Sequence, residues 1–377
     1  MTKRNNAREL YIGVISGTSV DGLDIALLDM AAEITFIASE TLEFPVQLRS
    51  ELLALGQGDQ DNLDRLGTAD RVLGSFIAHA VLDFLKSQNL QTTDIIAIGS
   101  HGQTVRHRPD AADPFTWQIG DPNLIAEVTH ITTVADFRRR DMAASGQGAP
   151  LVPPFHAALL RVADEDRAIL NIGGISNLTT LPGDPGIAIS GFDTGPGNAL
   201  MDAWCAAQLG KPYDADGVWA ASGKVSAGLL ADLMTDPYLQ RPPPKSTGRE
   251  HYNLNWLQSR LPGNLAAEDV QQTLLEFTVV AITEAVANWA AATQRLILCG
   301  GGRLNPVLVY RLRGLLEVPV NTTEDYGYDG DAIEAGAFAW LAQRCLAGLT
   351  GSASSVTGAS GDRVLGGVYS AGREPLS

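Results

Sequence analysis

Apolar runs that predict buried strands recur along the chain, and several of them end at glycine or hydroxyl residues. Residues 10–15 and 23–28 flank one such turn, and residues 167–172 and 178–181 flank a second one. A short apolar run bounded by turn residues is typical of a buried strand. Because both halves begin with a strand, a glycine turn and a strand, the pattern predicts a duplicated core with a cleft between its halves.

Apolar residues at three- and four-residue spacing predict long helices in both halves. The helical patterns cover residues 72–85, about 268–292 and about 330–346. Further strands are predicted at residues 34–38, 94–99, 186–190 and 295–299.

The glycine-rich run 145–150 suits a domain boundary. We therefore place an N-terminal domain at residues 1–145 and a C-terminal domain at residues 146–377. Packing of the last helix or tail back onto the first domain is left open.

One carboxylate, Asp193, lies in the glycine-rich stretch 191–198, which the pattern predicts to be a turn between a short strand and a helix. Free amides and the positive end of the dipole at a helix N-terminus attract anions, so this turn predicts an anion site beside Asp193. The alternative is an Asp that caps the helix and glycines that only form the turn. This stretch alone supports the two interpretations equally.

Two more glycine turns follow buried strands. Residues 16–22 join two strands, and Asp21 and Asp24 have the oxygen atoms to orient a metal ion or its waters, although an ordinary hairpin is slightly favoured for this turn alone. Residues 300–302 precede Asn305 and the start of a helix. Three glycines in succession let the backbone approach a phosphorylated ligand closely, which a tight turn alone rarely needs.

Polar residues near other element ends are further candidates. His101 follows the strand 94–99, at the sheet edge where open α/β sheets bind ligands, although a lone histidine is more often structural. The run Arg138 to Arg140 lies between acids, and such runs are most often solvated surface. Glu334 lies in the first turn of the last helix, where the dipole favours an acid.

Composition narrows the classes of partner. The 377 residues are 45% apolar and 19% charged, which is ordinary for a soluble protein of two domains. A formal charge of −16 argues against nucleic acid or an anionic membrane as the main partner. Three separate cysteines offer no disulfide framework, and no signal peptide or membrane span is found, so we expect a cytoplasmic protein. Walker A, GxGxxG and GxSxG motifs are absent.

Taken in order, a set of short motifs resembles the anhydro-N-acetylmuramic acid kinase family from about Tyr11 to Gly367. Each motif is weak alone, but the ordered set is highly specific. Val20 stands where the family commonly has Leu, and Ser100 stands where Cys is frequent. The motifs cover residues 16–22, 100–104, 118–121, 136–141, 146–153, 171–175, 193–198 and 245–250.

The resemblance implies an α/β fold of two actin-like ATPase (ribonuclease H-like) domains, with ATP and a sugar meeting in a central cleft. It implies that water opens the anhydro bridge of 1,6-anhydro-N-acetylmuramic acid while O6 takes the γ-phosphoryl group of ATP, in cell-wall recycling. ATP and Mg²⁺ are the expected cofactors, and a helix-rich second half is compatible with a homodimer. The alternatives are another sugar or acid kinase of the superfamily and a non-kinase actin-like ATPase.

The resemblance and the glycine turns together predict the site residues. Asp193 is the expected base that activates water, and Asp21 is the candidate metal ligand. Sugar contacts are expected from His101, Gly120, Arg138 and Glu334. ATP and phosphate contacts are expected from Gly17, Thr18, Ser19, Val20, Asp21, Gly22, Leu23, Asp24, Gly173, Gly195, Gly197, Gly300, Gly301, Gly302 and Asn305.

Overall fold

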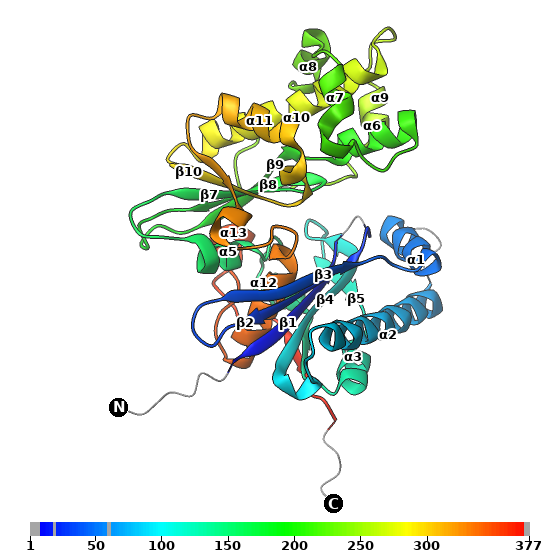
Figure 1. The fold of residues 1–377 in the computed structure, drawn as a ribbon, viewed down its shortest axis with the longest axis vertical. Helices are drawn as coiled ribbons and strands as arrows, with labels where there is room; N and C mark the ends of the chain where they lie inside the picture. Colours follow the sequence, from blue (N-terminus) through cyan, green and yellow to red (C-terminus); the bar gives the residue numbers. More distant parts are fainter. Residues whose placement is uncertain (1–7, 18–19, 59–61, 373–377) are drawn as a thin grey trace, which may run out of the picture. The chain divides into compact units, whose positions relative to one another are not determined.

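A computed structural model describes residues 8–17, 20–58 and 62–372 of the chain. Thr18 and Ser19, two of the expected phosphate contacts, lie outside the described residues. The chain forms two compact units (Figure 1), one of Met1–Phe155 with Ala332–Ser377 and the other of His156–Asp331. These divisions, at 155/156 and 331/332, differ from the single boundary expected at 145/146.

The first unit is built on one sheet with the strand order β12-β6-β4-β1-β2-β3, and β5 pairs with β4. Its central strand β1 runs antiparallel to β2 and parallel to β4. The strands are β1 (Leu10–Ser16), β2 (Leu23–Asp29), β3 (Thr35–Leu42), β4 (Ile95–Arg108), β5 (Phe115–Ile119), β6 (Thr133–Ala135) and β12 (Gly367–Tyr369). The helices are α1 (Val46–Gln57), α2 (Leu63–Ser87), η1 (Thr92–Asp94), α3 (Pro122–Thr129), α4 (Phe137–Met142), α5 (Pro153–Leu160), which continues into the second unit, α12 (Ile333–Leu346) and α13 (Ser354–Thr357).

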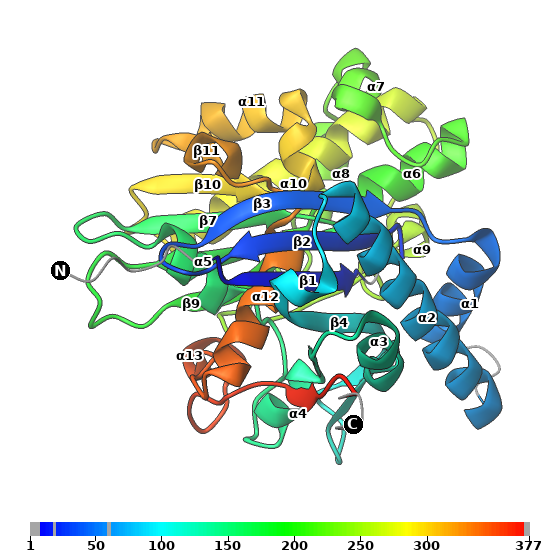
Figure 2. The ribbon, with the colours of Figure 1, turned by 60° about the horizontal axis from the view of Figure 1, so that its bottom comes forward.

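Side-chain alternation in β1 explains how helices cover both faces of this sheet (Figure 2). Ile12 and Val14 are fully buried and pack in one cluster with the apolar face of α2. Gly13 faces the other way, where a Cβ would overlap the carbonyl oxygen of Ala335 in α12. Gly99 in β4 meets the same helix as closely. Glycine in both strands therefore lets α12, from the end of the chain, pack directly on the first sheet.

The second unit repeats this arrangement in a sheet with the order β11-β10-β7-β8-β9. Strands β7, β8 and β9 are antiparallel neighbours, and β10 and β11 continue the sheet in parallel with β7. The strands are β7 (Arg167–Ile172), β8 (Ile175–Leu181), β9 (Ser190–Pro196), β10 (Arg295–Cys299) and β11 (Val320–Thr322). The helices are α6 (Ala199–Leu209), η2 (Ala215–Gly217), α7 (Val218–Ser222), α8 (Ala227–Leu233), α9 (Leu254–Gln258), α10 (Ala267–Trp289), η3 (Gly301–Leu304), α11 (Pro306–Leu315) and η4 (Thr323–Tyr326).

Both sheets have the same core order: three antiparallel strands and then two parallel ones. The order β3-β2-β1-β4-β6 in the first unit corresponds to β9-β8-β7-β10-β11 in the second. This is the ribonuclease H-like order, so the predicted α/β class of two such domains is confirmed. Among the described residues, no helix is both long enough and apolar enough to cross a membrane.

Two predicted boundaries near candidate residues are wrong. The expected turn at residues 191–198 is mostly strand, because β9 runs from Ser190 to Pro196 and places Asp193 opposite Asn177 of β8. The glycines there accommodate an irregular edge strand, with a register shift in β8 and a φ of 150° at Gly195. Strand β4 does not end near residue 99 but continues to Arg108, because it forms a hairpin with β5.

Candidate active site

Asp193 is held by a loop that lies along the outer edge of β9. Its backbone amide donates to the carbonyl oxygen of Lys245 at 3.1 Å, and its carbonyl oxygen accepts from the Tyr238 hydroxyl at 2.8 Å. Its carboxylate Oδ2 accepts from the Thr247 amide at 3.0 Å. Three separate bonds therefore fix the backbone and the carboxyl group of this half-buried residue.

Burial raises the pKa of the Asp193 carboxyl to about 6, and the charge of Glu250 acts in the same direction. The Thr247 amide and the charge of Lys245 oppose that rise. A carboxylate with this pKa is ionised at neutral pH and is more basic than an ordinary Asp. The geometry therefore makes Asp193 suited to accept a proton.

Three glycine turns of the second unit meet beside β7. The amide of Gly197 donates to the carbonyl oxygen of Gly174 at 2.9 Å, and the amide of Asn198 donates to that of Gly173 at 2.8 Å. A Cβ at Gly302 would overlap Ile172 at the end of β7. The structure thus brings together the 173–174, 195–197 and 300–302 turns, as phosphate binding by all three requires.

The helix N-terminus next to Asp193 differs from the prediction. The amides of Gly197, Asn198 and Ala199 all donate to turn carbonyl oxygens, so these amides are not open to an anion. Asp193 does not cap the helix either, because its carboxylate bonds to Thr247. The capping interpretation of this stretch is therefore wrong. The anion site beside Asp193 stays a prediction, and the amides of residues 197–199 are not its donors because the two glycine turns bond to each other.

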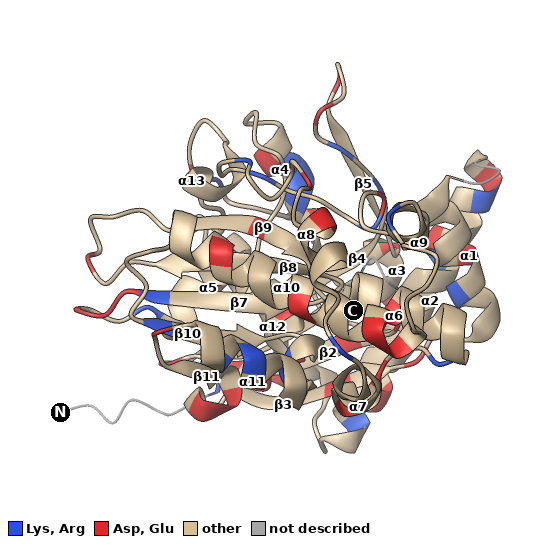
Figure 3. Ribbon diagram, turned by 90° about the horizontal axis from the view of Figure 1, so that it is seen from above, with Lys and Arg blue, Asp and Glu red and all other residues tan. Residues whose placement is uncertain are grey.

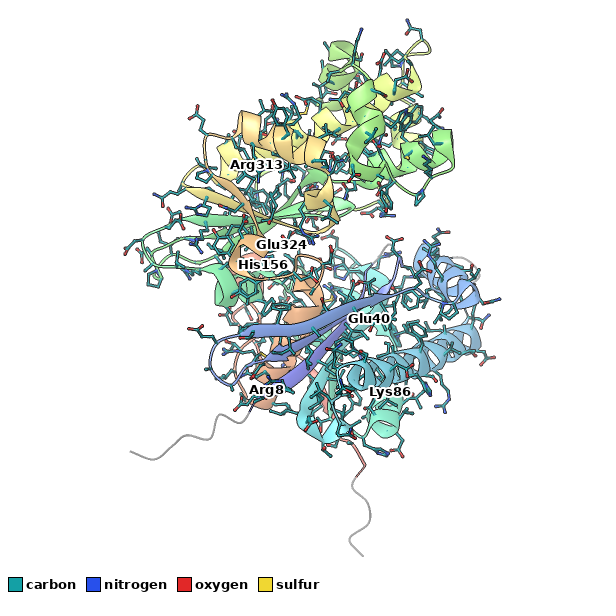
Figure 4. All side chains as sticks on the ribbon, in the orientation of Figure 1. Arg8, Glu40, Lys86, His156, Arg313 and Glu324 are labelled. Atoms are coloured by element: carbon teal, nitrogen blue, oxygen red, sulfur yellow. The ribbon has the colours of Figure 1, made fainter. Side chains whose placement is uncertain are left out.

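Residues near the 300–302 turn have structural partners that the sequence did not reveal. Asn305 caps α11, since its Oδ1 accepts from the amides of Val307 and Leu308 at 3.1 Å each. Arg303 is buried and bonds to Asp331 through two nitrogens and to Glu324, which is labelled in Figure 4, at 2.7 Å. These bonds hold the turn against the segment 324–331.

The β1–β2 turn of the first unit holds the other expected phosphate residues. The amide of Val20 donates to the carbonyl oxygen of Gly17 at 3.1 Å, and Val20 has a φ of 55°, which is rare for a β-branched residue. The Asp21 side chain is 71% exposed and pairs with Arg49 at 3.4 Å. Asp24 instead accepts from the Thr41 hydroxyl at 2.7 Å. Asp21 is thus the more accessible carboxylate of this turn.

Two further predicted residues of this turn have mainly packing roles. Leu23 is fully buried in the core, and a Cβ at Gly22 would approach the Thr41 methyl group within 2.8 Å. Of these two residues, only backbone atoms are suited to contact a nucleotide.

His101, Arg138 and Glu334, three of the expected sugar residues, come together in the first unit. Arg138 Nε donates to His101 Nε2 at 2.9 Å, and Arg138 Nη1 donates to the carbonyl oxygen of Gly148 at 2.8 Å. His101 Nδ1 then carries the proton and donates to the carbonyl oxygen of Gly102 at 3.0 Å. The negative charge of Glu334 acts on Arg138, which places the two residues in one electrostatic environment.

Burial determines the protonation of this group. It lowers the pKa of His101 well below its usual value, and the charge of Arg138 adds to that effect. Burial also lowers the pKa of Arg138 to about 10, while Glu334 and Asp141 oppose the change. At neutral pH the pair is therefore a neutral imidazole and a charged guanidinium.

The arginine run of α4 is not uniformly solvated surface. Arg139 and Arg140 are exposed, whereas Arg138 is half-buried (Figure 3 shows the basic residues of α4). Asp141 is fully buried, and it accepts from the Thr357 hydroxyl and from the Gly148 amide at 2.8 Å each. The helical turn of α4 separates the side chains, so one arginine points inward while its neighbours face solvent.

Gly120 joins His101 at a small cavity of about 70 Å³ in the first unit. The amide of Gly120 donates to Asp70 Oδ1 at 2.6 Å, and this bond fixes the end of β5. Asp136 and Arg139 also line the cavity and pair with each other at 2.8 Å. His101 and Gly120, which are far apart in the sequence, are therefore neighbours in space.

Two ribonuclease H-like units, each with a glycine turn after its first strand, define the class of actin-like ATPases and sugar kinases. Within that class, the chain belongs to the anhydro-N-acetylmuramic acid kinase family, whose sequence profile matches residues 9–371. It is 51% identical over 369 residues to the anhydro-N-acetylmuramic acid kinase of Xanthomonas axonopodis pv. citri, covering 96% of this chain and 98% of that protein.

Two other relatives have the same name. The identity is 52% over 369 residues with the protein of Xanthomonas campestris pv. campestris (strain 8004), covering 96% of this chain and 97% of that one. It is 50% over 364 residues with the protein of Coxiella burnetii (strain Dugway 5J108-111), covering 96% of this chain and 98% of that one. The resemblance expected from the ordered motifs is thus confirmed over nearly the whole chain, and with it the assignment to a family of phosphotransferases.

Proposed function

We propose that this protein is an ATP-dependent kinase that opens the 1,6-anhydro bridge of 1,6-anhydro-N-acetylmuramic acid and phosphorylates O6, giving N-acetylmuramic acid 6-phosphate for cell-wall recycling. The family membership supports the substrate and the phosphoryl donor. The observation that carries the mechanism is Asp193, a half-buried carboxylate with a pKa of about 6 that is fixed by Thr247 and Tyr238.

In this proposal Asp193 accepts a proton from the water that attacks C1 of the sugar. The new C1–O bond replaces the C1–O6 bond, and O6 attacks the γ-phosphorus of ATP while ADP leaves. Atoms balance as one water, one anhydro sugar and one ATP giving the 6-phosphate, ADP and a proton. A carboxylate base of this kind contributes on the order of 10²–10⁴ in rate.

The glycine turns supply the phosphate side of the proposal. Phosphoryl transfer depends on positioning and charge neutralisation, which closely approaching backbone provides. In the second unit, a Cβ at Gly173 would be in ordinary contact with the carbonyl oxygen of Ile175 at 3.5 Å, and a Cβ at Gly301 would meet no described atom within 4 Å. Neither backbone position is therefore covered closely by described protein atoms on that side.

Mg²⁺ is part of the same proposal, with Asp21 as its protein ligand. Among the described residues no group of three or more His, Cys, Asp or Glu side chains is arranged to hold a metal. Mg²⁺ in kinases is usually held by one or two carboxylates, waters and the substrate phosphates, and the exposed Asp21 carboxylate fits that pattern. Bound Mg²⁺ would neutralise phosphate charge.

On the sugar side, we infer that His101, Gly120, Arg138 and Glu334 form the binding residues of the first unit. Arg138 uses Nε and Nη1 for His101 and Gly148, and its Nη2 has no hydrogen bond among the described residues. A charged nitrogen of this kind suits the lactyl carboxylate of the sugar. The expected cytoplasmic location and homodimer complete the proposal, and size-exclusion chromatography with light scattering tests the homodimer.

The decisive experiment is a coupled ADP-release assay with Mg-ATP. It compares 1,6-anhydro-N-acetylmuramic acid with N-acetylmuramic acid and N-acetylglucosamine, and it includes EDTA followed by excess Mg²⁺. Turnover with the anhydro sugar alone, lost in EDTA and restored by Mg²⁺, is the expected result. Preference for an ordinary sugar would indicate another kinase of the superfamily, and sugar-independent hydrolysis would indicate a non-kinase ATPase.

A further inference from the structure

The guanidinium group of Arg249 lies over the glycine turn between β7 and β8. A Cβ built on Gly174 would lie 3.0 Å from Arg249 Nε and 3.1 Å from Nη2. These distances are tighter than ordinary contact, so the absence of a side chain at position 174 is what lets the guanidinium approach this turn. Gly174 thus leaves the space that the Arg249 guanidinium occupies, and we call this position the glycine seat.

Arg249 is exposed, and its guanidinium makes no hydrogen bond or ion pair with the described part of the chain. Its backbone is nevertheless fixed, because its carbonyl oxygen accepts from Asn253 Nδ2 at 3.3 Å. The guanidinium of arginine carries five N–H donors and no acceptor. Beside the glycine turn, the Arg249 guanidinium is therefore a charged set of donors without an acceptor among the described residues.

The same loop also holds the proposed base. Thr247, two residues before Arg249, donates its amide to the Asp193 carboxylate at 3.0 Å. The loop 245–250 therefore places a carboxylate contact and a guanidinium within one short segment of the second unit. A Cβ at the neighbouring Gly173 would be only in ordinary contact with Ile175, at 3.5 Å from its carbonyl oxygen.

We propose that Arg249 contacts the transferred γ-phosphoryl group and stabilises its charge in the transition state. This inference rests on the proposed kinase function and adds a catalytic residue to it. Two phosphoryl oxygens would accept hydrogen bonds from the guanidinium, because the spacing of two phosphate oxygens matches that of two guanidinium N–H groups. Charge that develops on those oxygens is greatest in the transition state, so the contact raises kcat more than it lowers KM.

The first test compares Arg249→Lys and Arg249→Ala with the matched control Arg241→Ala. Arg241 is also exposed and lies in the same connection between α8 and α9, with its guanidinium 5.9 Å from the Tyr238 ring centroid, and it has no place in the proposed mechanism. Loss of one transition-state donor typically lowers kcat about 10²–10³-fold. We expect that loss in Arg249→Ala, a partial loss in Arg249→Lys, and little change in the KM for either substrate. Added guanidinium ion should restore part of the activity of Arg249→Ala.

The second test uses the seat. Gly174→Ala should push the guanidinium away and lower kcat in the wild-type background, but it should cost much less in the Arg249→Ala background. An equal loss of kcat from Gly174→Ala in both backgrounds would show that Gly174 does not act through Arg249. Thermal denaturation checks folding, and because Arg249 is exposed its variants should melt like wild type.

Two outcomes would overturn the proposal itself. One is an unchanged kcat in Arg249→Ala, and the other is an effect confined to the KM of the sugar, which would make Arg249 a sugar contact. The wild-type assay separates this failure from failure of the proposed function. If the wild type phosphorylates a different sugar, the same kcat loss is expected with that sugar, because the claim concerns the phosphoryl group.

Discussion

Replacing the proposed base, Asp193→Asn, should remove activity and at the same time stabilise the protein. Asparagine has nearly the same shape, and its Oδ1 can still accept from the Thr247 amide that now donates to Asp193 at 3.0 Å. The backbone bonds of residue 193 to Lys245 and Tyr238 do not involve the side chain. The substitution therefore changes the charge and the basicity of the group while leaving its support in place.

The size of the stability gain follows from the pKa of Asp193. Its ordinary value is 3.8, and burial raises it to about 6 in the folded protein. Ionising this carboxyl then costs folding stability, with no cost below about pH 4 and the full cost above about pH 6. Two pKa units correspond to about 3 kcal/mol, an upper bound for a carboxyl that water partly reaches. At pH 8 the variant should be about 1–3 kcal/mol more stable than wild type.

Two assays test this reasoning. Thermal denaturation should give a higher Tm for the variant at pH 8, by about 2–4 °C per kcal/mol, and equal Tm values near pH 4. The coupled assay should show a loss of about 10²–10⁴-fold in kcat, with ATP binding retained. The wild-type kcat/KM should fall about tenfold per pH unit below pH 6, because the base must be ionised. A variant that is less stable than wild type at pH 8 would refute the burial argument, and unchanged turnover would remove Asp193 from the mechanism.

Three other substitutions, one of them with a control, test the packing of the first unit and its sugar side. Gly13→Ala should prevent soluble folding or destabilise the protein by more than about 3 kcal/mol in urea denaturation, because its Cβ would overlap the Ala335 carbonyl. The control Gly67→Ala in α2, whose Cβ would meet no described atom within 4 Å, should be neutral or slightly stabilising. Asp141→Asn should cost about 1–3 kcal/mol in the same experiment. Each oxygen of the buried Asp141 carboxylate accepts one hydrogen bond, from Gly148 and from Thr357, whereas the amide of Asn has only one acceptor oxygen. Arg138→Gln should raise the KM of the sugar at least about tenfold while leaving the KM of ATP unchanged, and an equal rise in both would contradict its assignment to the sugar.

Much of the fold was predictable because its core strands are short apolar runs that end at glycine. The predicted strands at residues 10–15, 167–172 and 295–299 match β1, β7 and β10 closely. The sequence left open whether the last helix or tail packs on the first domain, because that packing depends on the close approach of α12 to Gly13 and Gly99. The tail elements α13 and β12 have four and three residues, too few to produce a periodic pattern.

Candidate residues of the site could be named from the sequence because each lies in a short motif, but their contacts could not, because the partners are distant along the chain. His101 and Arg138 were expected from separate motifs, but their 2.9 Å bond depends on α4 following β6, which itself pairs with β4. Arg303 gave no sequence signal, because its acidic partners lie some 20 to 30 residues further on. Arg249 lies in the motif 245–250, yet only the structure places it over Gly174.

Hydrogen bonds to Asp193 hold the loop 245–250 in place. A loop held in this way has no periodic sequence pattern, so its position could not be predicted from the sequence. The loop has no regular secondary structure, and its position is set by bonds to one edge-strand residue: the amide of Asp193 to Lys245 and the carboxylate to Thr247. Lys245 is buried and donates to the carbonyl oxygens of Tyr238 and Leu239, which closes the loop on itself. An irregular segment ordered by the exposed edge of a strand has hydrogen bonds but no repeating apolar face. Because the backbone bonds persist when the carboxylate is neutralised, Asp193→Asn should leave Arg249 over its glycine seat. The kinetic effects of the two residues are therefore separable by experiment.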